Sequence, residues 1–575
     1  MLTAAPLLAQ SVEIVPLSDV RAGQRGIGRT VLEGPEPEEF PVEVLGVLEN
    51  IGPQQSLIIV RLGGEKLSRY GVVAGMSGSP IYLDGKLAGA VAYAFPFSKE
   101  PIAGVRPIEE MIYGFEPPAQ TAGARRPSLQ DLLAGREPLL PRQGFGDGDS
   151  FIPIASPAAL GGFPASVTEV FREEFRTLGL KPVQGAGGRV RDGDSPELQP
   201  GGMIGVSLIR GDLDLFAAGT VTHIDSEGRV FAFGHQFLSV GPTELPMASA
   251  DVVTVVPSLE NSFKIAGLGA PLGKITLDRA AGVVGLPGPG PELTKTNVRM
   301  HGSDGASREL NFELVRDPFL TPLLLQLGAF AAIDAGERQL GPSTVRVRGR
   351  ALFEQDAPPL ILDDIYAGAA AVGLQAALGM AAPLAFVLQT AAGELAVKSV
   401  ELEITSAAER RVARLLRAWT EQTRVTPGET LEVSALVRLP DGAEEVRRAE
   451  YVVPASAPPG RLLITISDAR QLNMLEYPLL IDAEKLPAAD LIRAVNRLRR
   501  GDAFYLRVWR QDRPLEIGAH RLAAPPAWLR RVVDASEGAR NVFVSSGGVS
   551  LHESELARFD AAAEGAVTLE TVVSQ

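Results

Sequence analysis

The first 115 residues alternate apolar and polar positions in short runs that turn residues interrupt. Residues 40–48 (F-P-V-E-V-L-G-V-L) and 56–62 (S-L-I-I-V-R-L) have a pattern typical of strands. Residues 81–91 predict two strands around Asp84-Gly85, a dipeptide that favours a tight hairpin turn. This part of the chain is therefore expected to be rich in β-structure.

The rest of the chain mixes alternating strands with apolar helices. We expect strands over 203–209, 215–224, 229–233, 430–438 and 504–510, and helices over 129–133, 165–178, 320–332 and 488–499. The uncharged run 367–389 is rich in Ala and Gly and contains Gln375 and Pro383. We therefore expect a pair of buried helices there and no integral membrane span.

Shifts in composition divide the chain into seven ranges. Residues 116–150 hold five prolines and a Gly-Asp-Gly-Asp run, which predicts an exposed linker. The expected ranges are 1–10 (the remnant of a signal peptide), 11–115, 116–150 (linker), 151–300, 301–405 (a mixed β/α domain), 406–470 (a β-sandwich-like domain) and 471–575 (an α/β region).

Composition and charge exclude several classes of protein. The 575 residues include 55 Lys+Arg and 69 Asp+Glu, a formal net charge of −14, which argues against a nucleic-acid binder that works by bulk charge. The absence of cysteine excludes disulfides, a thiol nucleophile and cysteine-based metal sites. The 61 Gly and 44 Pro favour a turn-rich β protein.

The first ten residues, M-L-T-A-A-P-L-L-A-Q, are apolar and end near a small residue, Ala9. They resemble the end of a secretory signal peptide, although a basic segment before them is missing. The expected location is extracytoplasmic: periplasmic, secreted or associated with the cell envelope.

The segment G-M-S-G-S-P, residues 75–80, is the first candidate for chemistry. Glycines beside a serine allow backbone conformations that other residues avoid, and such a turn can aim two N–H groups at one point. We expect the N–H groups of Gly75 and Ser77 to form an oxyanion hole. The alternative is an ordinary Gly/Ser-rich turn that leads into the hairpin.

The residues around Ser77 distinguish two types of serine hydrolase. The nucleophile elbow of α/β-hydrolases has G-x-S-x-G between a strand and a helix, whereas here Ser79 replaces the last glycine and a hairpin follows. The segment is more similar to the G-D-S-G-G-P loop of trypsin-like double-barrel proteases. Met76 stands where that loop has Asp, so the activation pairing made by that Asp should be absent.

A longer stretch strengthens this similarity. Together with residues 98–105, Pro107-Ile108 and Glu110-Met111, the serine segment resembles the SpoIVB serine peptidase family, named for a protease that signals in bacterial sporulation. The resemblance implies a chymotrypsin-like double β-barrel, built here from the ranges 11–115 and 151–300. It also implies that Ser77 is the nucleophile, with Ser79 as the less favoured hydroxyl.

The general base has to follow the serine in the sequence, because none of the five histidines precedes residue 223. His235 follows a glycine at the end of an apolar strand and resembles the Gly-His motif of the same family, which implies that it is the base. A core histidine that only satisfies a buried group is the alternative. His223 is a weaker candidate, and His301, His520 and His552 lie in polar contexts.

The third member of a triad is not assigned. Glu65, Asp225 and Asp251 are weak candidates, each more typical of a solvated turn. No metal or organic cofactor is expected, since no His-rich metal motif is present. The resemblance has one departure: sporulation proteases carry the histidine motif before the serine motif, whereas here residue 77 precedes residue 235. A catalytic triad is defined by its geometry and not by the order of its residues in the sequence, so the same site can form with the serine first.

Together these features predict a mainly β, exported serine endopeptidase that acts on a protein or peptide substrate. The alternative is an inactive peptidase-like scaffold that binds cell-envelope proteins, which the unassigned acid and the changed motif order favour. Architecture alone suggests a cell-envelope partner for the downstream domains, and no nucleic acid is expected.

Overall fold

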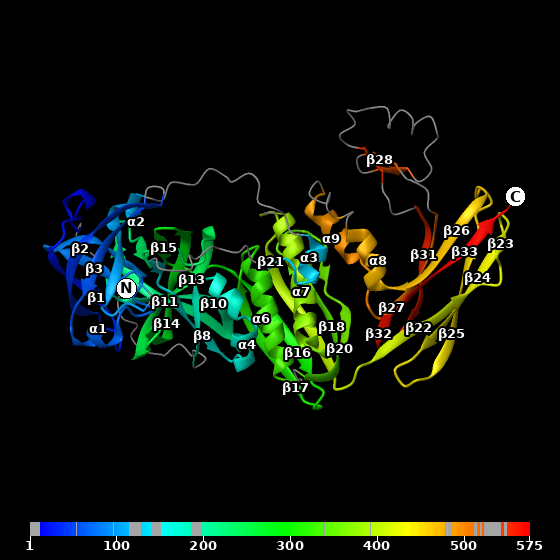
Figure 1. The fold of residues 1–575 in the computed structure, drawn as a ribbon, viewed down its shortest axis with the longest axis horizontal. Helices are drawn as coiled ribbons and strands as arrows, with labels where there is room; N and C mark the ends of the chain where they lie inside the picture. Colours follow the sequence, from blue (N-terminus) through cyan, green and yellow to red (C-terminus); the bar gives the residue numbers. More distant parts are fainter. Residues whose placement is uncertain are drawn as a thin grey trace, which may run out of the picture.

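The computed structural model is mainly β and extends from an N-terminal barrel to a C-terminal sandwich (Figure 1). It describes residues 12–52, 55–95, 97–113, 128–139, 151–185, 198–336, 340–391, 393–477, 480, 486–510, 515–517, 520–522, 542–544 and 549–574. The expected signal-peptide remnant, 1–10, lies outside these residues. Two barrels, a curved sheet with two helices, and the sandwich follow one another along the long axis (Figure 1).

Six antiparallel strands form the first barrel. They are Arg25–Thr30 (β1), Glu38–Gly52 (β2), Gln55–Leu62 (β3), Pro80–Leu83 (β4), Lys86–Ala94 (β5) and Ile102–Pro107 (β6). They pair in the order β4-β1-β2-β3-β6-β5, and pairing of β5 with β4 closes the ring. In the β4–β5 turn both Asp84 and Gly85 have positive φ, as a two-residue hairpin turn requires. Two short helices, Glu65–Tyr70 (α1) and Ile108–Tyr113 (α2), and the strand Ile152–Pro153 (β7) complete this part.

A second ring of six antiparallel strands follows. Its members are Met203–Gly211 (β10), Asp214–Ile224 (β11), Val230–Ala232 (β12), Gly241–Val256 (β13), Phe263–Arg279 (β14) and Gly282–Pro287 (β15). The order β10-β13-β14-β15-β12-β11 closes through pairing of β11 with β10. Ser156–Gly161 (β8) and Leu180–Gln184 (β9) extend it beside β11. The predicted double-barrel fold is confirmed, with the serine segment in the first barrel.

The two barrels share apolar contacts. One buried cluster joins Leu87 and Met111 of the first barrel to Phe231 of the second. Another joins Val31 to Met203 and Ala250. The two barrels therefore form one packed unit.

The helix expected over 165–178 is two short helices, Ala165–Val170 (α4) and Arg172–Thr177 (α5). Phe171 lies between them with φ −102° and ψ 23°, outside helical geometry, and its ring is buried. Its edge-to-face contact with Phe330, with ring centroids 5.5 Å apart, anchors the break to the middle of the molecule.

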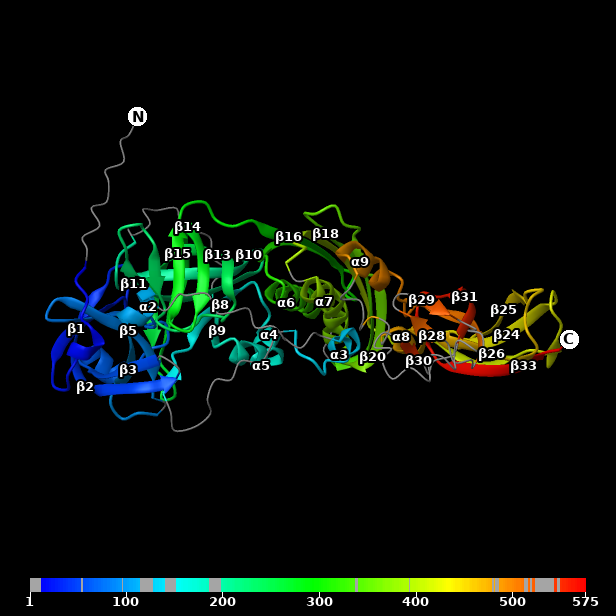
Figure 2. The same cartoon turned by 90° about the horizontal axis from the view of Figure 1, so that it is seen from above.

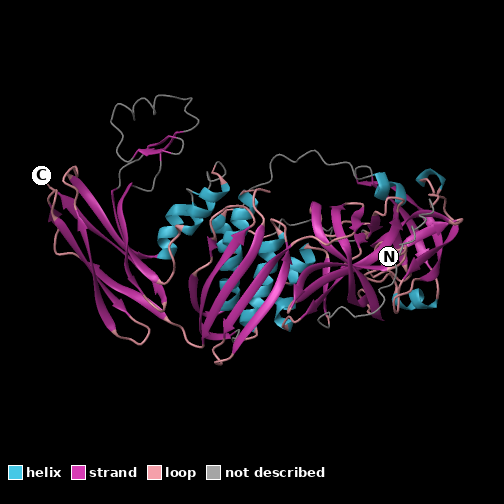
Figure 3. Ribbon diagram, turned by 180° about the vertical axis from the view of Figure 1, so that it is seen from behind, coloured by secondary structure: helices cyan, strands magenta, loops and turns pink. Residues whose placement is uncertain are grey.

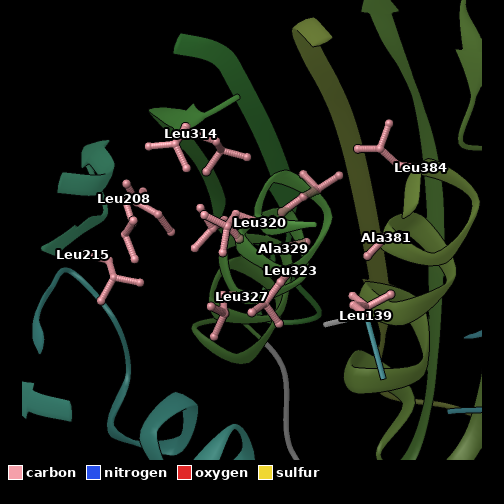
Figure 4. Close-up of a cluster of buried hydrophobic side chains, with 14 of the residues drawn as sticks. Leu139, Leu208, Leu215, Leu314, Leu320, Leu323, Leu327, Ala329, Ala381 and Leu384 are labelled. Atoms are coloured by element: carbon pink, nitrogen blue, oxygen red, sulfur yellow. The ribbon is translucent and has the colours of Figure 1, made fainter. Parts of the chain in front are cut away.

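The middle part continues the sheet of the second barrel, because β10 pairs with β17. Its elements are Leu293–His301 (β16), Ser307–Val315 (β17), Leu320–Asp334 (α6), Leu340–Phe353 (β18), Leu360–Ile361 (β19), Asp364–Ala370 (β20), Val372–Thr390 (α7) and Val397–Ala407 (β21). The sheet curves around α6 and α7 (Figure 2). Leucines of the second barrel, such as Leu208 and Leu215, lie in the same core as Leu320 and Leu327 of α6 (Figure 4).

The apolar run 367–389 forms one long helix and not the expected pair. Its first residues belong to β20, which pairs with β18, and Ala371 with φ +54° separates the strand from α7. The helix keeps Pro383 in its interior. Among the described helices, α7 is long and apolar enough to cross a membrane. However, 61% of its most apolar stretch is buried inside the fold.

Part of the expected linker is packed. Its predicted helix has the expected bounds, Leu129–Leu133 (α3), and Ser128 caps it by accepting from the Asp131 N–H. Leu132 is buried in the middle core, and the Gln389 side chain of α7 donates to the Leu139 carbonyl. The expectation of an exposed linker therefore does not apply to residues 128–139, and most of the remaining linker lies outside the described residues.

The C-terminal part contains a sandwich of a four-stranded and a five-stranded sheet (Figure 3), together with a separate three-stranded sheet and two helices. Its elements are Val412–Trp419 (β22), Arg424–Val425 (β23), Thr430–Arg438 (β24), Glu444–Val452 (β25), Gly460–Asp468 (β26), Ala469–Glu476 (α8), Ala488–Asn496 (α9), Ala503–Arg510 (β27), Leu515–Ile517 (β28), His520–Leu522 (β29), Val542–Val544 (β30), Val549–Arg558 (β31), Ala562–Glu564 (β32) and Ala566–Val573 (β33). Strand β26 pairs with both β27 and β33, so the expected ranges 406–470 and 471–575 share one sheet.

Candidate active site

The serine segment forms a tight loop between α1 and β4. Gly75 and Gly78 both have φ +96°, a conformation that glycine adopts without the steric cost other residues meet. The N–H of Met76 donates to the Val73 carbonyl, and the N–H of Gly78 donates to the Val91 carbonyl at 2.7 Å. The loop is thus closed on itself and tied to β5.

Strand β11 of the second barrel holds the carbonyl side of this loop. The Thr220 N–H donates to the Ser77 carbonyl at 2.8 Å, and the Thr220 hydroxyl donates to the Gly75 carbonyl at 3.0 Å. The Thr222 hydroxyl donates to the Gly78 carbonyl at 2.7 Å. Three loop carbonyls are therefore fixed by one strand of the opposite barrel.

This arrangement leaves two N–H groups of the loop free. Within the described part of the chain, the N–H groups of Gly75 and Ser77 donate to no acceptor, whereas those of Met76, Gly78 and Ser79 do. Gly75 and Ser77 are the pair expected from the sequence to form an oxyanion hole. Preorganised N–H donors of this kind stabilise the negative oxygen of an acyl-transfer transition state.

The other side chains of the loop have structural contacts. The Met76 side chain is buried in the core of the first barrel, where the Asp of trypsin-like loops is replaced by an apolar group. The Ser79 hydroxyl donates to the Met76 carbonyl at 2.6 Å. Ser77 is thus left as the hydroxyl of this loop without a hydrogen-bond partner.

A backbone kink places His235 directly after β12. Phe233 has φ +69° and Gly234 has φ +68°, so two successive residues occupy the left-handed region. For a bulky residue such as Phe233 this costs on the order of 1–2 kcal/mol. The Phe233 ring is buried, and Gly219 makes room for it: a Cβ on Gly219 would lie 2.7 Å from that ring. Packing of the Phe233 ring thus holds the backbone in this strained conformation, as is typical of turns at functional sites.

The serine loop and the histidine turn meet at the same residue of β5. Gly78 donates to the Val91 carbonyl, and a Cβ placed on Gly234 would lie 3.4 Å from that oxygen. A Cβ on Gly78 would lie 2.6 Å from the Phe233 nitrogen. The fold therefore brings together the two motifs, which are separated by more than 150 residues in sequence, through backbone contacts that only glycine permits.

The environment of His235 keeps its imidazole neutral. Its Nδ1 lies 2.6 Å from the Gln236 carbonyl, an acceptor, so the proton resides on Nδ1 and Nε2 carries the lone pair. Burial, to which the nearby Arg106 guanidinium adds, lowers the pKa of His235 to about 4, although the backbone carbonyls of Gln236 and Ile154 oppose the shift. A neutral imidazole with a free Nε2 is the form that can accept a proton from a serine.

Ser77 and His235 are both shielded from solvent, with 0% and 4% of their surface exposed. The Ser77 Oγ and the His235 Nε2 are buried and have no hydrogen-bond partner, so they do not bond to each other in this structure. Buried polar atoms without partners are rare and costly, and they call for a functional or conformational reason.

We expect acid to weaken the second barrel through His235. Its pKa is lower in the folded protein than its ordinary 6.5, so its stabilising contribution is fully present above pH 6.5 and is lost as the pH falls toward 4. The loss amounts to roughly 3 kcal/mol. Asp278 on β14, whose pKa burial raises to about 6, contributes in the opposite direction over the same pH range in both proteins, so the difference between them is the measure. Hydrogen exchange of peptides from β11 and β12, corrected for intrinsic rates, should show that acid destabilises the wild type more than His235→Gln. His301→Gln, which replaces an exposed histidine, is the control; an unchanged slope in His235→Gln would contradict the assignment.

A segment of the second barrel covers the serine loop. The Ala74 N–H donates to the Ser262 carbonyl at 2.8 Å, and the Lys264 N–H donates to the Ala74 carbonyl at 3.1 Å. We call residues 262–264 the hairpin clamp, since they begin β14 and pair with Ala74. The stem of Lys264 lies 3.2 Å from where a Gly75 Cβ would be, and its ammonium donates to the Thr30 hydroxyl at 2.9 Å. Burial lowers the pKa of Lys264 to about 7.

None of the acids considered from the sequence contacts His235 in the described structure. Glu65 is exposed at the start of α1. Asp225 accepts from the turn after β11 and pairs with Arg229 at 2.6 Å. Asp251 lies on β13 with one buried oxygen that lacks a partner. The imidazole contacts come instead from the backbone, from the carbonyls of Gln236 and Ile154.

Three of the other histidines have contacts of their own outside the serine loop. His223 is buried on β11 and stacks on Phe231, with ring centroids 6.0 Å apart. His301 is half-exposed near Glu403, and His552 lies near Ser554. The side chain of His520 is outside the described part. Among the described residues no cluster of three or more His, Asp or Glu could hold a metal ion.

Sequence reasoning missed Thr220, Thr222 and Lys264. The alternation T-V-T-H at 220–223 could have marked two threonines on one face of a strand, although nothing in the pattern links that face to the serine loop. An isolated lysine in an otherwise apolar strand start gives no signal of burial. These residues act through contacts between distant parts of the chain.

Two closed antiparallel barrels with a Gly-Ser loop from one and a Gly-His turn from the other have the architecture of chymotrypsin-like serine peptidases. Residues 3–112 match the family model described as SpoIVB peptidase S55, which confirms the resemblance seen in the sequence. The match covers the serine loop and ends in α2, so it does not include His235. Neither the curated proteins nor the solved structures gave a match.

Proposed function

We propose that this protein is an exported serine endopeptidase of the SpoIVB type, with Ser77 as nucleophile and His235 as general base. Two observations carry the proposal: the N–H groups of Gly75 and Ser77 donate to no acceptor among the described residues, and the Ser77 Oγ and the His235 Nε2 are buried without a hydrogen-bond partner. A protein or peptide substrate is the expected ligand, outside the cytoplasm.

In the proposed reaction His235 Nε2 takes the proton of the Ser77 hydroxyl as its oxygen attacks the peptide carbonyl. The N–H groups of Gly75 and Ser77 stabilise the tetrahedral oxyanion. The imidazolium then gives its proton to the leaving amine as the C–N bond breaks, and an acyl-serine remains. Water, deprotonated by the same imidazole, hydrolyses this ester and restores the serine.

The reaction requires the site to open, because both groups are buried in this structure. Opening would have to move the hairpin clamp from Ala74 and allow the imidazole to reach the Ser77 hydroxyl. Movable segments gate the active sites of many enzymes. The closed state is the observation that favours the alternative, an inactive scaffold that binds envelope proteins.

Labelling with a fluorophosphonate probe distinguishes the two. An activated serine is expected to be modified, with the adduct mapped to Ser77 and lost in Ser77→Ala. Ser249→Ala is the matched control, since Ser249 is also buried with an unpartnered hydroxyl but has no Gly-Ser loop around it. Absence of a Ser77 adduct after long incubation and after mild destabilisation would overturn the enzyme proposal and leave the scaffold.

A further inference from the structure

A buried carboxylate lies behind the histidine turn. Asp278 is on β14, 1% exposed, and no basic side chain of the described residues pairs with it. Its Oδ1 accepts from the Phe237 N–H at 2.8 Å, and its Oδ2 accepts from the Leu238 N–H at 2.6 Å. A longer contact of 3.4 Å reaches the Val240 N–H. The carboxylate thus accepts hydrogen bonds from several N–H groups of the backbone that follows His235.

One peptide unit joins this carboxylate to the imidazole. The carbonyl of the Gln236–Phe237 peptide accepts from His235 Nδ1, and the N–H of the same peptide donates to Asp278. The order is therefore imidazole N–H, peptide C=O, peptide N–H, carboxylate. The two hydrogen bonds measure 2.6 Å and 2.8 Å.

The peptide bond can transmit the influence of the carboxylate. Its C–N bond has partial double-bond character, so nitrogen electrons are shared with the carbonyl oxygen. A negative acceptor on the N–H increases the negative charge on that oxygen, and chains of hydrogen bonds strengthen one another in a low-dielectric interior. The Gln236 carbonyl is then a stronger acceptor for Nδ1–H than an ordinary backbone carbonyl.

We propose that Asp278 is a positioning residue that orients His235 through the Gln236–Phe237 peptide, in the place of a carboxylate that contacts the imidazole directly. The catalytic consequence rests on the proposed function; the orientation of the imidazole does not. In serine peptidases the triad carboxylate fixes the tautomer and stabilises the imidazolium. Here a carboxylate one peptide further away has the same task.

The cost of burying this carboxylate argues against an incidental loop contact. Burial raises the pKa of Asp278 to about 6, although the N–H bonds from the loop oppose the shift. A buried acid without a cationic partner is expensive to retain when the same turn could be held by a neutral acceptor. Asp317 provides a comparison: it also accepts two backbone N–H groups, from Phe319 and Leu320, but at the start of α6.

The test uses the full chain labelled with ¹⁵N-histidine. Only five histidines are present, and the His235→Gln variant assigns the signal of His235. In the wild type we expect His235 to carry its proton on Nδ1. In Asp278→Asn we expect the Nδ1–H proton signal to move upfield and the Nε2–H tautomer to become populated. Fluorophosphonate labelling of Ser77 should slow about 10–100-fold, by analogy with the loss of groups that orient metal-binding histidines.

Asp317→Asn is the matched control, which should lose a similar structural contact and leave the His235 signals unchanged. Asp278→Thr is a second uncharged variant, whose hydroxyl accepts one N–H without placing an amide donor against Leu238. A folded Asp278→Asn or Asp278→Thr with wild-type His235 signals would overturn the inference. Absence of labelling in the wild type would overturn the enzyme proposal instead, while the histidine signals still decide the role of Asp278.

Discussion

His235→Gln is expected to react with a fluorophosphonate roughly 10³-fold more slowly than the wild type, as befits loss of a general base. Glutamine is polar and similar in size but cannot take the proton of Ser77. The N–H groups of Gly75 and Ser77 remain in place, so a residual rate above that of an ordinary serine is expected. The rate of Ser77 adduct formation, followed by mass spectrometry, is the measurement.

The matched control for this variant is His223→Gln. His223 is also buried in the second barrel, but it stacks on Phe231 and is not part of the histidine turn. Its replacement should change the labelling rate little, even if the barrel loses stability. Equal losses of rate in both variants would mean that His235 supports only the fold, and would remove it as the base.

Gly78→Ala is expected to separate the two barrels. Its φ is +96°, and an added Cβ would lie 1.9 Å from the Thr220 carbonyl oxygen and 2.6 Å from the Phe233 nitrogen. Both are backbone atoms, so neither can rotate away. The left-handed conformation and the overpacking together predict a loss of about 4 kcal/mol. Thermal unfolding and hydrogen exchange in β4 and β11 measure it.

Gly23→Ala separates the conformational cost from the steric one. Gly23 has φ +85°, yet nothing lies within 4 Å of where its Cβ would be. We expect it to lose only about 1 kcal/mol, the cost of the left-handed conformation alone. If Gly78→Ala were no more damaging than Gly23→Ala, the close approach of the barrels at the serine loop would be incorrect.

Local patterns predicted many of the individual helices, strands and turns. The Asp84-Gly85 turn, strand β24 and helix α3 could be placed from the sequence because turn chemistry, alternation and capping are encoded within a few residues. The run that became α7 was harder, since Ala and Gly do not indicate where β20 ends. The double barrel itself came from family resemblance and not from periodicity.

The parts of the site that depend on distant contacts could not be predicted. Thr220 and Asp278 form hydrogen bonds with main-chain groups. Since almost every residue has a carbonyl and an N–H, the sequence does not indicate which main-chain group is the partner. The acids that the sequence offered, Glu65, Asp225 and Asp251, were candidates for direct contact with the imidazole. In the structure Asp278 contacts the imidazole only through the Gln236–Phe237 peptide, and no spacing of residues in the sequence predicts such an indirect contact.

The hairpin clamp has a kinetic consequence for anyone who studies this protein with inhibitors. If the Ala74 pairing must break before Ser77 is reached, modification follows a pre-equilibrium, and an opening free energy of about 3 kcal/mol leaves roughly one molecule in 150 receptive at any time. At high reagent concentration the rate then stops rising and equals the rate of opening. In that regime the measured reaction rate does not distinguish one inhibitor from another. Every inhibitor at saturating concentration reacts at the rate at which residues 262–264 move.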